Sequence, residues 1–181
     1  MRVEDGAATL INTVTLQNLA STVVGPGGSV VASPSCCYYA VVNPGASIDV
    51  INGADGTTAV HSAPVGPAAR AEWSPDWCGV ALISQSGSVI VINLVTGTSV
   101  TSSPVGPNPS VTWGPVGCLY AVIQPGGSVL VYKSTGELVE RLSPVGNNVT
   151  VTFGPDCTYS ISDPVTGVTR KSWGALKLRY R

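Results

Sequence analysis

The five cysteines are the most versatile reactive residues of this chain, because a cysteine can act as a nucleophile, a metal ligand or a disulfide partner. Four of them recur at spacings of 41, 40 and 39 residues: Cys37, Cys78, Cys118 and Cys157. None belongs to a Cys-x-x-Cys or Cys/His cluster with the spacing of a zinc site, and an odd number at regular spacing does not suggest a disulfide framework. Because an unpaired cysteine is among the most often buried residue types, we expect these four to be core residues that bind no metal.

His61 is the single histidine and the natural candidate for a general base. A Ser-His-Asp site would need His61 to meet a serine and either Asp49 or Asp55, yet no segment has the pattern of a nucleophile elbow. The acidic residues stand singly, without the context of a glycosidase pair or a calcium loop. We therefore expect His61 on the surface of an outer strand, and we predict a protein that is not an enzyme and has no catalytic residues or cofactor.

A basic segment at the C-terminus is the one clear charge feature. The last twelve residues carry five basic side chains and no acid, whereas residues 1–169 have a net charge of −6. Leu176, Leu178 and Tyr180 alternate with these charges as in a packed strand, so we expect the segment to contact protein, either the same chain or other subunits. Binding to nucleic acid phosphates is the lesser alternative. The predicted contact residues are Arg170, Lys171, Trp173, Lys177, Leu178, Arg179, Tyr180 and Arg181.

The composition is that of a weakly charged protein. Charged residues make up 10% of the chain, against about 25% in typical soluble domains, so the surface repels its neighbours weakly and suits packing against them. The sequence shows no signal peptide and no apolar run of membrane-spanning length. Together with the unpaired cysteines, this predicts an intracellular, cytoplasmic protein or a virion component, with no membrane partner.

A repeat of about 40 residues must position all of these side chains. The dipeptide Val-Gly begins each unit, at Val24, Val65, Val105 and Val145, and it keeps step with the cysteines. In the third unit, short β-branched or alternating runs near 110–114, 118–124, 128–133 and 137–143 are separated by Gly, Pro and Ser-Thr-Gly turns, which is typical of strands. No window has helical apolar spacing. Four short strands per repeat predict an all-β protein built from propeller blades.

Several repeated segments carry a resemblance to a known family. They are Trp73-Ser74-Pro75-Asp76, Trp113-Gly114-Pro115 and Phe153-Gly154-Pro155-Asp156, together with residues 87–92 followed by Thr96-Gly97 and residues 127–132 followed by Thr135-Gly136. In these the chain resembles the WD-repeat β-propeller family over most of residues 24–167. Ile51-Asn52, Ile92-Asn93 and Tyr132-Lys133 stand where the family has Trp-Asp, and the Gly-His pair is missing. The resemblance implies a degenerate propeller, and it implies binding of a protein or peptide on one face of a ring.

Aromatic residues share one position of the repeat. They are Trp73, Trp113 and Phe153, with Ala32 in the first unit. An aromatic ladder of this kind suits ligand stacking, but we expect it to be core between blades. Trp77 and Trp173 break the pattern and are the better candidates for exposed contacts.

These units predict one domain over residues 1–181, a small propeller of about four four-stranded blades. The units are 24–64, 65–104, 105–144 and 145–172, with an N-terminal strand segment at 1–23 and a basic tail at 173–181. The favoured closure has residues 13–19 complete the last blade as its outer strand. Two alternatives stay open: the last unit runs four strands of its own to Arg181, leaving a free N-terminal arm, or two chains share one larger ring.

The sequence favours a structural role over catalysis. We expect a non-enzymatic scaffold, a subunit of a larger assembly such as a virion, shell or filament, whose termini make the subunit contacts. The alternative is a soluble adaptor propeller that binds a protein or peptide on one face of its ring.

Overall fold

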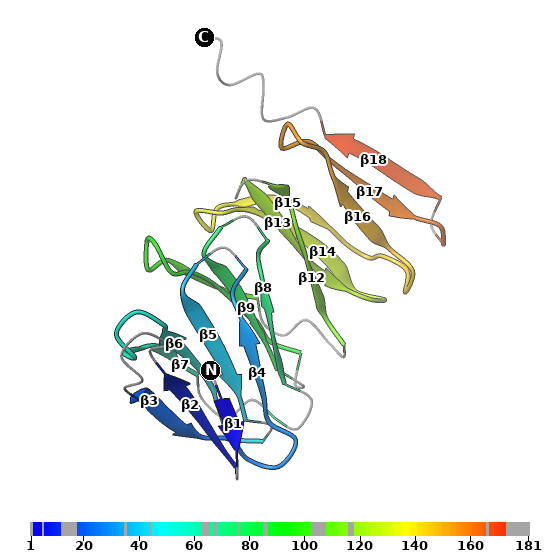
Figure 1. Cartoon of the computed structure of the whole chain (residues 1–181). Coiled ribbons are helices and arrows are strands. Elements are labelled where there is room, and N and C mark those ends of the chain that lie inside the picture. Colours follow the sequence, from blue (N-terminus) through cyan, green and yellow to red (C-terminus); the bar gives the residue numbers. More distant parts are fainter. Residues whose placement is uncertain are drawn as a thin grey trace.

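The computed structural model is built entirely from β-strands and turns in the part of the chain that it describes (Figure 1). The described residues are 2–4, 6–11, 18–34, 36–43, 45–62, 66, 69–75, 77–84, 87–102, 108–115, 118–165 and 167–172. The all-β prediction is confirmed. No helix in this part is long and apolar enough to cross a membrane.

The strands form five antiparallel sheets, which we number I to V in chain order. Sheet I contains β1 (Arg2–Glu4), β2 (Ala7–Ile11) and β3 (Asn18–Val23). Sheet II contains β4 (Ser29–Ala32), β5 (Tyr38–Val42), β6 (Ile48–Asn52) and β7 (Thr58–His61). Sheet III contains β8 (Arg70–Trp73), β9 (Gly79–Ile83), β10 (Val89–Asn93) and β11 (Ser99–Ser102). Sheet IV contains β12 (Ser110–Trp113), β13 (Leu119–Gln124), β14 (Ser128–Lys133) and β15 (Leu138–Leu142), and sheet V contains β16 (Thr150–Phe153), β17 (Tyr159–Asp163) and β18 (Val168–Ser172).

Turn chemistry explains where the strands end. In sheet IV the four strands fall within one residue of the ranges expected from the sequence. The turns between the third and fourth strands of sheets II, III and IV each place a glycine at positive φ: 77° at Gly56, 70° at Gly97 and 91° at Gly136. Glycine adopts this conformation without the steric cost that a Cβ would impose.

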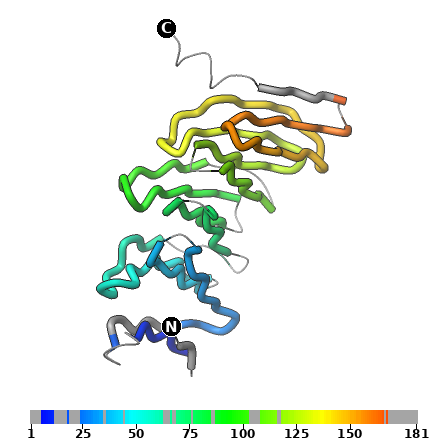
Figure 2. The backbone as a smooth tube through the Cα atoms, turned by 45° about the horizontal axis from the view of Figure 1, so that its top comes forward, coloured from blue at the N-terminus to red at the C-terminus, as the bar shows by residue number. Residues whose placement is uncertain are grey.

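Neighbouring sheets pack face to face, in chain order, from sheet I at one end to sheet V at the other (Figures 1 and 2). Four separate apolar clusters fill the four spaces between the five sheets. The second strand of each middle sheet is buried on both of its faces. In β9, for example, Val80 and Leu82 face sheet II whereas Ala81 and Ile83 face sheet IV. This explains why these strands read as continuous apolar runs in the sequence.

The Val-Gly marker of the repeat has a structural role at the junctions between sheets. The N–H of Gly25 donates to Asn43 Oδ1 at 2.9 Å. In the last unit the N–H of Gly146 donates to Asp163 Oδ2 at 2.8 Å. Both acceptors follow or end the second strand of their sheet, so the same contact recurs 120 residues later. The Gly146 carbonyl also accepts the N–H of Gly126 in the preceding sheet at 3.3 Å, which ties sheets IV and V together.

The N-terminal segment forms a sheet of its own. Residues 18–23 pair with β2, so residues 18 and 19 of the strand predicted to complete the last unit belong to sheet I instead. Residues 13–17 of that predicted strand lie outside the described residues. The N–H of Val24 donates to Gly6 O at 2.6 Å, as the N–H of Val145 donates to Gly127 O at 3.2 Å. The β1–β2 turn therefore corresponds to the β13–β14 turn. Sheet I thus contains the second, third and fourth strands of a unit.

The far face of sheet V differs from the same face of the other sheets. Val42, Ile83 and Ile123 occupy one position of the second strand and pack against the following sheet. Ser162 occupies that position in β17 and is exposed. Polar outer faces are typical of the terminal units of repeat proteins, because no following unit covers them. Sheet V therefore closes the apolar stack at its C-terminal end.

Candidate functional site

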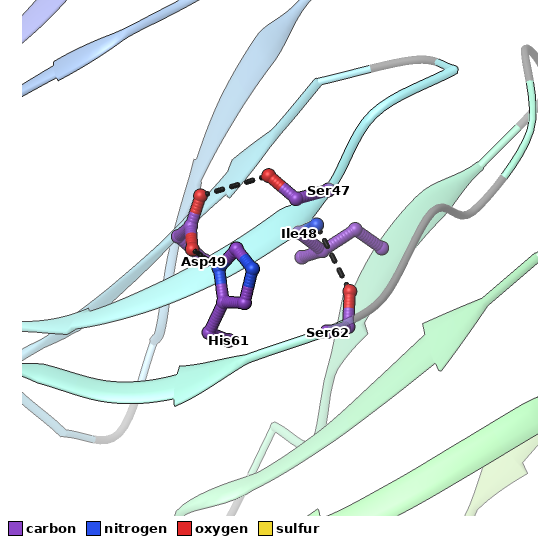
Figure 3. A network of polar contacts seen from close by, with 5 residues as sticks. All are labelled: Ser47, Ile48, Asp49, His61 and Ser62. Carbon is purple, nitrogen blue, oxygen red and sulfur yellow. Dashed lines mark hydrogen bonds and ion pairs between the residues drawn. The ribbon is translucent and has the colours of Figure 1, made fainter.

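A polar network on sheet II is the nearest approach to a catalytic arrangement in the described residues (Figure 3). Asp49 of β6 and His61 of β7 are register partners in neighbouring strands. His61 Nδ1 lies 2.5 Å from Asp49 Oδ1, and Ser47 Oγ donates to Asp49 Oδ2 at 3.1 Å. The His61 side chain is 68% exposed, whereas that of Asp49 is 15% exposed. The carboxylate thus holds one end of an imidazole whose other end faces solvent.

In this network no serine hydroxyl is hydrogen-bonded to His61, as a serine nucleophile would have to be. A serine nucleophile must lie within hydrogen-bond reach of the base that takes its proton. Ser47 instead bonds to the carboxylate, and Ser62 Oγ accepts the N–H of Ile48 at 2.9 Å in a buried backbone contact. We conclude that the group fastens the edge strand β7 to β6. The prediction of an exposed His61 on an outer strand is confirmed.

Two aspartates stabilise turns. The Asp55 carboxylate accepts the N–H of Thr57 at 2.9 Å and its hydroxyl at 2.7 Å, and chiefly the backbone contact lowers the pKa of Asp55. In the fourth unit the hydroxyl of Thr158 donates to Asp156 at 2.6 Å and is the main cause of the lowered pKa of that carboxyl. Both carboxyls are fully exposed and stay ionised, which suits a turn acceptor and not a general acid.

Three further acids also have local partners. Glu72 pairs with Arg70 at 2.8 Å, Glu137 pairs with Lys133 at 2.7 Å, and Glu140 accepts a hydrogen bond from the hydroxyl of Tyr159. Within the described ranges, no three His, Cys, Asp or Glu side chains come together as ligands of a metal ion would. Asp76 lies outside those ranges.

The cysteines depart most from what the sequence predicts. Cys118 and Cys157 form a disulfide with a Cα–Cα distance of 5.9 Å, which joins sheets IV and V. Cys37 is exposed, and Cys36 and Cys78 are half-buried. The expectation that the cysteines at 37, 78, 118 and 157 are buried core residues is therefore wrong for Cys37, and the expectation that no disulfide forms is wrong for one pair.

The packing of the sheets explains this disulfide. Face-to-face packing brings the loops before the second strands of neighbouring sheets together. The loop of the last unit is also one residue shorter. Its closing hydrogen bond runs from Gly154 N to Thr158 O, whereas the corresponding bond in sheet IV runs from Gly114 N to Leu119 O. Cys157 adopts a φ of 64° in the shortened loop.

An aromatic cluster at the junction of sheets III and IV was only partly foreseen. Trp77 and Trp113 meet edge to face with ring centroids 5.5 Å apart, Tyr120 lies 5.7 Å from Trp113, and Tyr132 stacks on Tyr120 at 5.3 Å. The prediction of Trp77 as an exposed contact is wrong, because its ring packs against this cluster. Trp73, Trp113 and Phe153 are half-buried and pack against three successive inter-sheet clusters, as their shared repeat position requires.

The polar atoms of this cluster are unevenly satisfied. The hydroxyl of Tyr132 lies 3.2 Å from Ser102 Oγ in a buried hydrogen bond. The Tyr120 hydroxyl and the indole nitrogens of Trp77 and Trp113 are buried and have no hydrogen-bond partner among the described residues. Burial, and secondarily the neighbouring Tyr132, raises the pKa of Tyr120. The Tyr120 hydroxyl therefore contributes desolvation cost without a compensating bond.

Replacing each tyrosine by phenylalanine separates these two environments. We expect Tyr120→Phe to raise the free energy of unfolding by about 1 kcal/mol, because it removes a buried and unbonded hydroxyl. Tyr132→Phe, the matched control, should lower it by about 1 kcal/mol through loss of the bond to Ser102. Urea titrations followed by tryptophan fluorescence measure both. Equal losses in the two variants would show that the Tyr120 hydroxyl has a partner.

The predicted protein-contact segment lies mostly outside the described residues. The backbone of Arg170 and Lys171 belongs to β18, opposite Ile161 and Ser160 of β17. Trp173, Lys177, Leu178, Arg179, Tyr180 and Arg181 are beyond the described ranges. Their role as contact residues stays a prediction.

Comparison with known proteins bears on the fold alone. No protein-family model matches the sequence, and no curated protein matches it either. Among solved structures, the chain is similar to the computationally designed Ika4 protein, with a TM-score of 0.53 and 15% identity over 86% of this chain and 97% of that one. It is also similar to the computationally designed Ika8 protein, with a TM-score of 0.52 and 13% identity over 94% of this chain and 56% of that one. At these identities the likeness extends to the arrangement of strands and not to any activity.

Proposed function

We propose that this chain is a degenerate β-propeller-type repeat whose role is structural, as a non-enzymatic subunit of a larger protein assembly. In this reading, sheets I to V are propeller blades left as an open series within one chain, and the assembly is of the virion, shell or filament kind. The observation that carries the proposal is the number of described strands in the two end sheets. Each middle sheet has four strands, whereas sheets I and V have three described strands each.

The described strands of the two end sheets correspond to different parts of the repeat unit. Sheet I has no described counterpart of the first strand of a unit, and sheet V has none of the fourth, since β18 pairs with β17 and is the last strand in the sheet order. An edge strand offers unpaired backbone groups to another chain. The polar face of sheet V, with Ser162 and Thr152 exposed, suits pairing at this edge better than apolar stacking on the face. The basic residues of the tail follow β18 directly and would meet an acidic neighbouring body.

Removing the tail tests this assignment. We expect the full chain to form a multimer in size-exclusion chromatography with light scattering, and the variant lacking residues 173–181 to form a smaller species. The matched control keeps the full length of the chain and replaces Lys177, Arg179 and Arg181 by serine. It distinguishes a contribution of the charges from a contribution of strand pairing. If both variants still form the full multimer, the tail is not part of the proposed contact. A chain that is monomeric at every concentration would overturn the assembly proposal itself.

One surface favours the adaptor alternative. Leu138 and Val139 at the start of β15 are 49% and 41% exposed, and Val95 in the neighbouring turn of sheet III is 78% exposed. The two turns are adjacent, because Asn93 Nδ2 lies 3.5 Å from Ser134 O. Exposed apolar residues that gather in this way are typical of protein-binding sites. A monomeric chain that loses a partner on Leu138→Ser substitution, but not on tail deletion, would favour this second function.

A further inference from the structure

Three free cysteines gather between sheets II and III, at the position where Cys118 and Cys157 join sheets IV and V. The Cys37 carbonyl accepts the N–H of Gly53 at 2.5 Å, and the Cys78 carbonyl accepts the N–H of Leu94 at 2.9 Å. Cys118 O accepts the N–H of Ser134 at 3.1 Å in the same way. Cys37, Cys78 and Cys118 therefore occupy one backbone position in three successive sheets.

Cys36 is the thiol that reaches the next sheet. Its Sγ lies 3.0 Å from Ser33 Oγ, and its side chain is near enough to Cys78 to help raise the pKa of that thiol. Cys36 occupies the loop position that Trp77 occupies in sheet III, and Trp77 likewise reaches forward to a residue of the following sheet, Trp113. The Cys37 side chain is exposed. The near pair across the junction is therefore Cys36 with Cys78.

We propose that Cys36 and Cys78 are a redox-active dithiol that closes to a second inter-sheet disulfide by exchange with a low-molecular-weight disulfide of the glutathione type. Closure would join sheet II to sheet III as the existing disulfide joins sheet IV to sheet V. Both thiols are half-buried, so the pair is accessible to a small disulfide. Two junctions of the stack would then be covalently joined, and the bond between sheets II and III would form according to the thiol–disulfide balance of the surroundings.

The exchange proceeds in two displacements. The Cys36 thiolate attacks one sulfur of the external disulfide, forming a mixed disulfide and releasing one small thiolate, which takes up the proton that Cys36 lost. The Cys78 thiolate then attacks Cys36 Sγ, forming the Cys36–Cys78 bond and releasing the second small thiol with the proton of Cys78. Two protein thiols are oxidised and one external disulfide is reduced to two thiols. Burial chiefly, with the Cys36 contact, raises the pKa of Cys78 to about 12, so we assign Cys78 the second step.

Incubation of the full chain with oxidised glutathione tests the proposal. The structure has three free cysteines. After oxidation we expect non-reducing peptide mapping to show the 36–78 link and thiol titration to find at most one thiol, that of Cys37. The Cys37→Ser variant is the matched control and should still form the link, losing both of its remaining thiols. Cys78→Ser should stop at the mixed disulfide on Cys36. Circular dichroism of each variant shows whether it is folded.

The stability of the oxidised chain gives an independent readout. The urea midpoint should rise on oxidation in the wild type and in Cys37→Ser, and it should not rise in Cys36→Ser or Cys78→Ser. Glutathione adducts on separate cysteines, with no internal link in folded wild-type protein, would overturn the proposal. A 37–78 link that forms in place of the 36–78 link would overturn the assignment of Cys36.

Discussion

Replacing Cys118 and Cys157 together by serine is expected to lower the free energy of unfolding by about 4 kcal/mol. The disulfide closes a loop of 39 residues, and the loss of loop entropy from the unfolded chain accounts for a contribution of about this size. The double variant avoids leaving a reactive partner thiol behind. Urea denaturation under non-reducing conditions measures the difference from the wild type.

Reduction of the wild type provides the control for this prediction. In the presence of a reductant the wild type and the double variant should unfold at the same urea concentration, because neither then contains the cross-link. A double variant as stable as the oxidised wild type would contradict the prediction. It would show that the contacts between sheets IV and V hold the protein together equally well without the disulfide.

Ile161→Ala is expected to be the most damaging single substitution in sheet V, with a loss of about 3 kcal/mol. Ile161 is completely buried in the middle of β17 and belongs to the cluster between sheets IV and V, together with Leu119 and Val131. Truncation removes apolar contacts and leaves a cavity that the two sheets cannot easily fill. Thermal and urea unfolding of the purified variant measure the loss.

The neighbouring residue supplies a matched control. Ser162 follows Ile161 on the same strand but is exposed on the far face of sheet V, so Ser162→Ala should change stability by less than about 0.5 kcal/mol. Ile161→Val, which keeps most of the side chain, should cost about 1 kcal/mol. Equal losses for Ile161→Ala and Ser162→Ala would mean that the far face is covered in solution, as it would be if another chain packed on it.

The strands and turns of the middle sheets could be predicted from the sequence because their signals are local. The strands of sheet IV were located within one residue, since β-branched runs and glycine turns act within a few residues of themselves. The exposed position of His61 followed from the same pattern. The pairing of His61 with Asp49 could not be foreseen in detail, because the register of β6 against β7 depends on a bulge between Val50 and Ile51.

The cysteines show where local signals fail. The 39-residue spacing of Cys118 and Cys157 indicates equivalent positions in two units, but it does not predict how far apart those units lie in space. That distance depends on face-to-face packing and on a loop one residue shorter before β17. The meeting of Trp77 with Trp113 arises in the same way.

The sequence by itself determined the repeat, the all-β class and the strands of the middle sheets, because periodicity and turn residues act over short stretches of chain. Only the tertiary structure decided how the units meet: a separate N-terminal sheet of β1 to β3, a polar far face on sheet V, and thiols from different units brought together. These features depend on which apolar faces pack against each other. That choice is made by contacts between residues about 40 positions apart, where no local pattern specifies the partner.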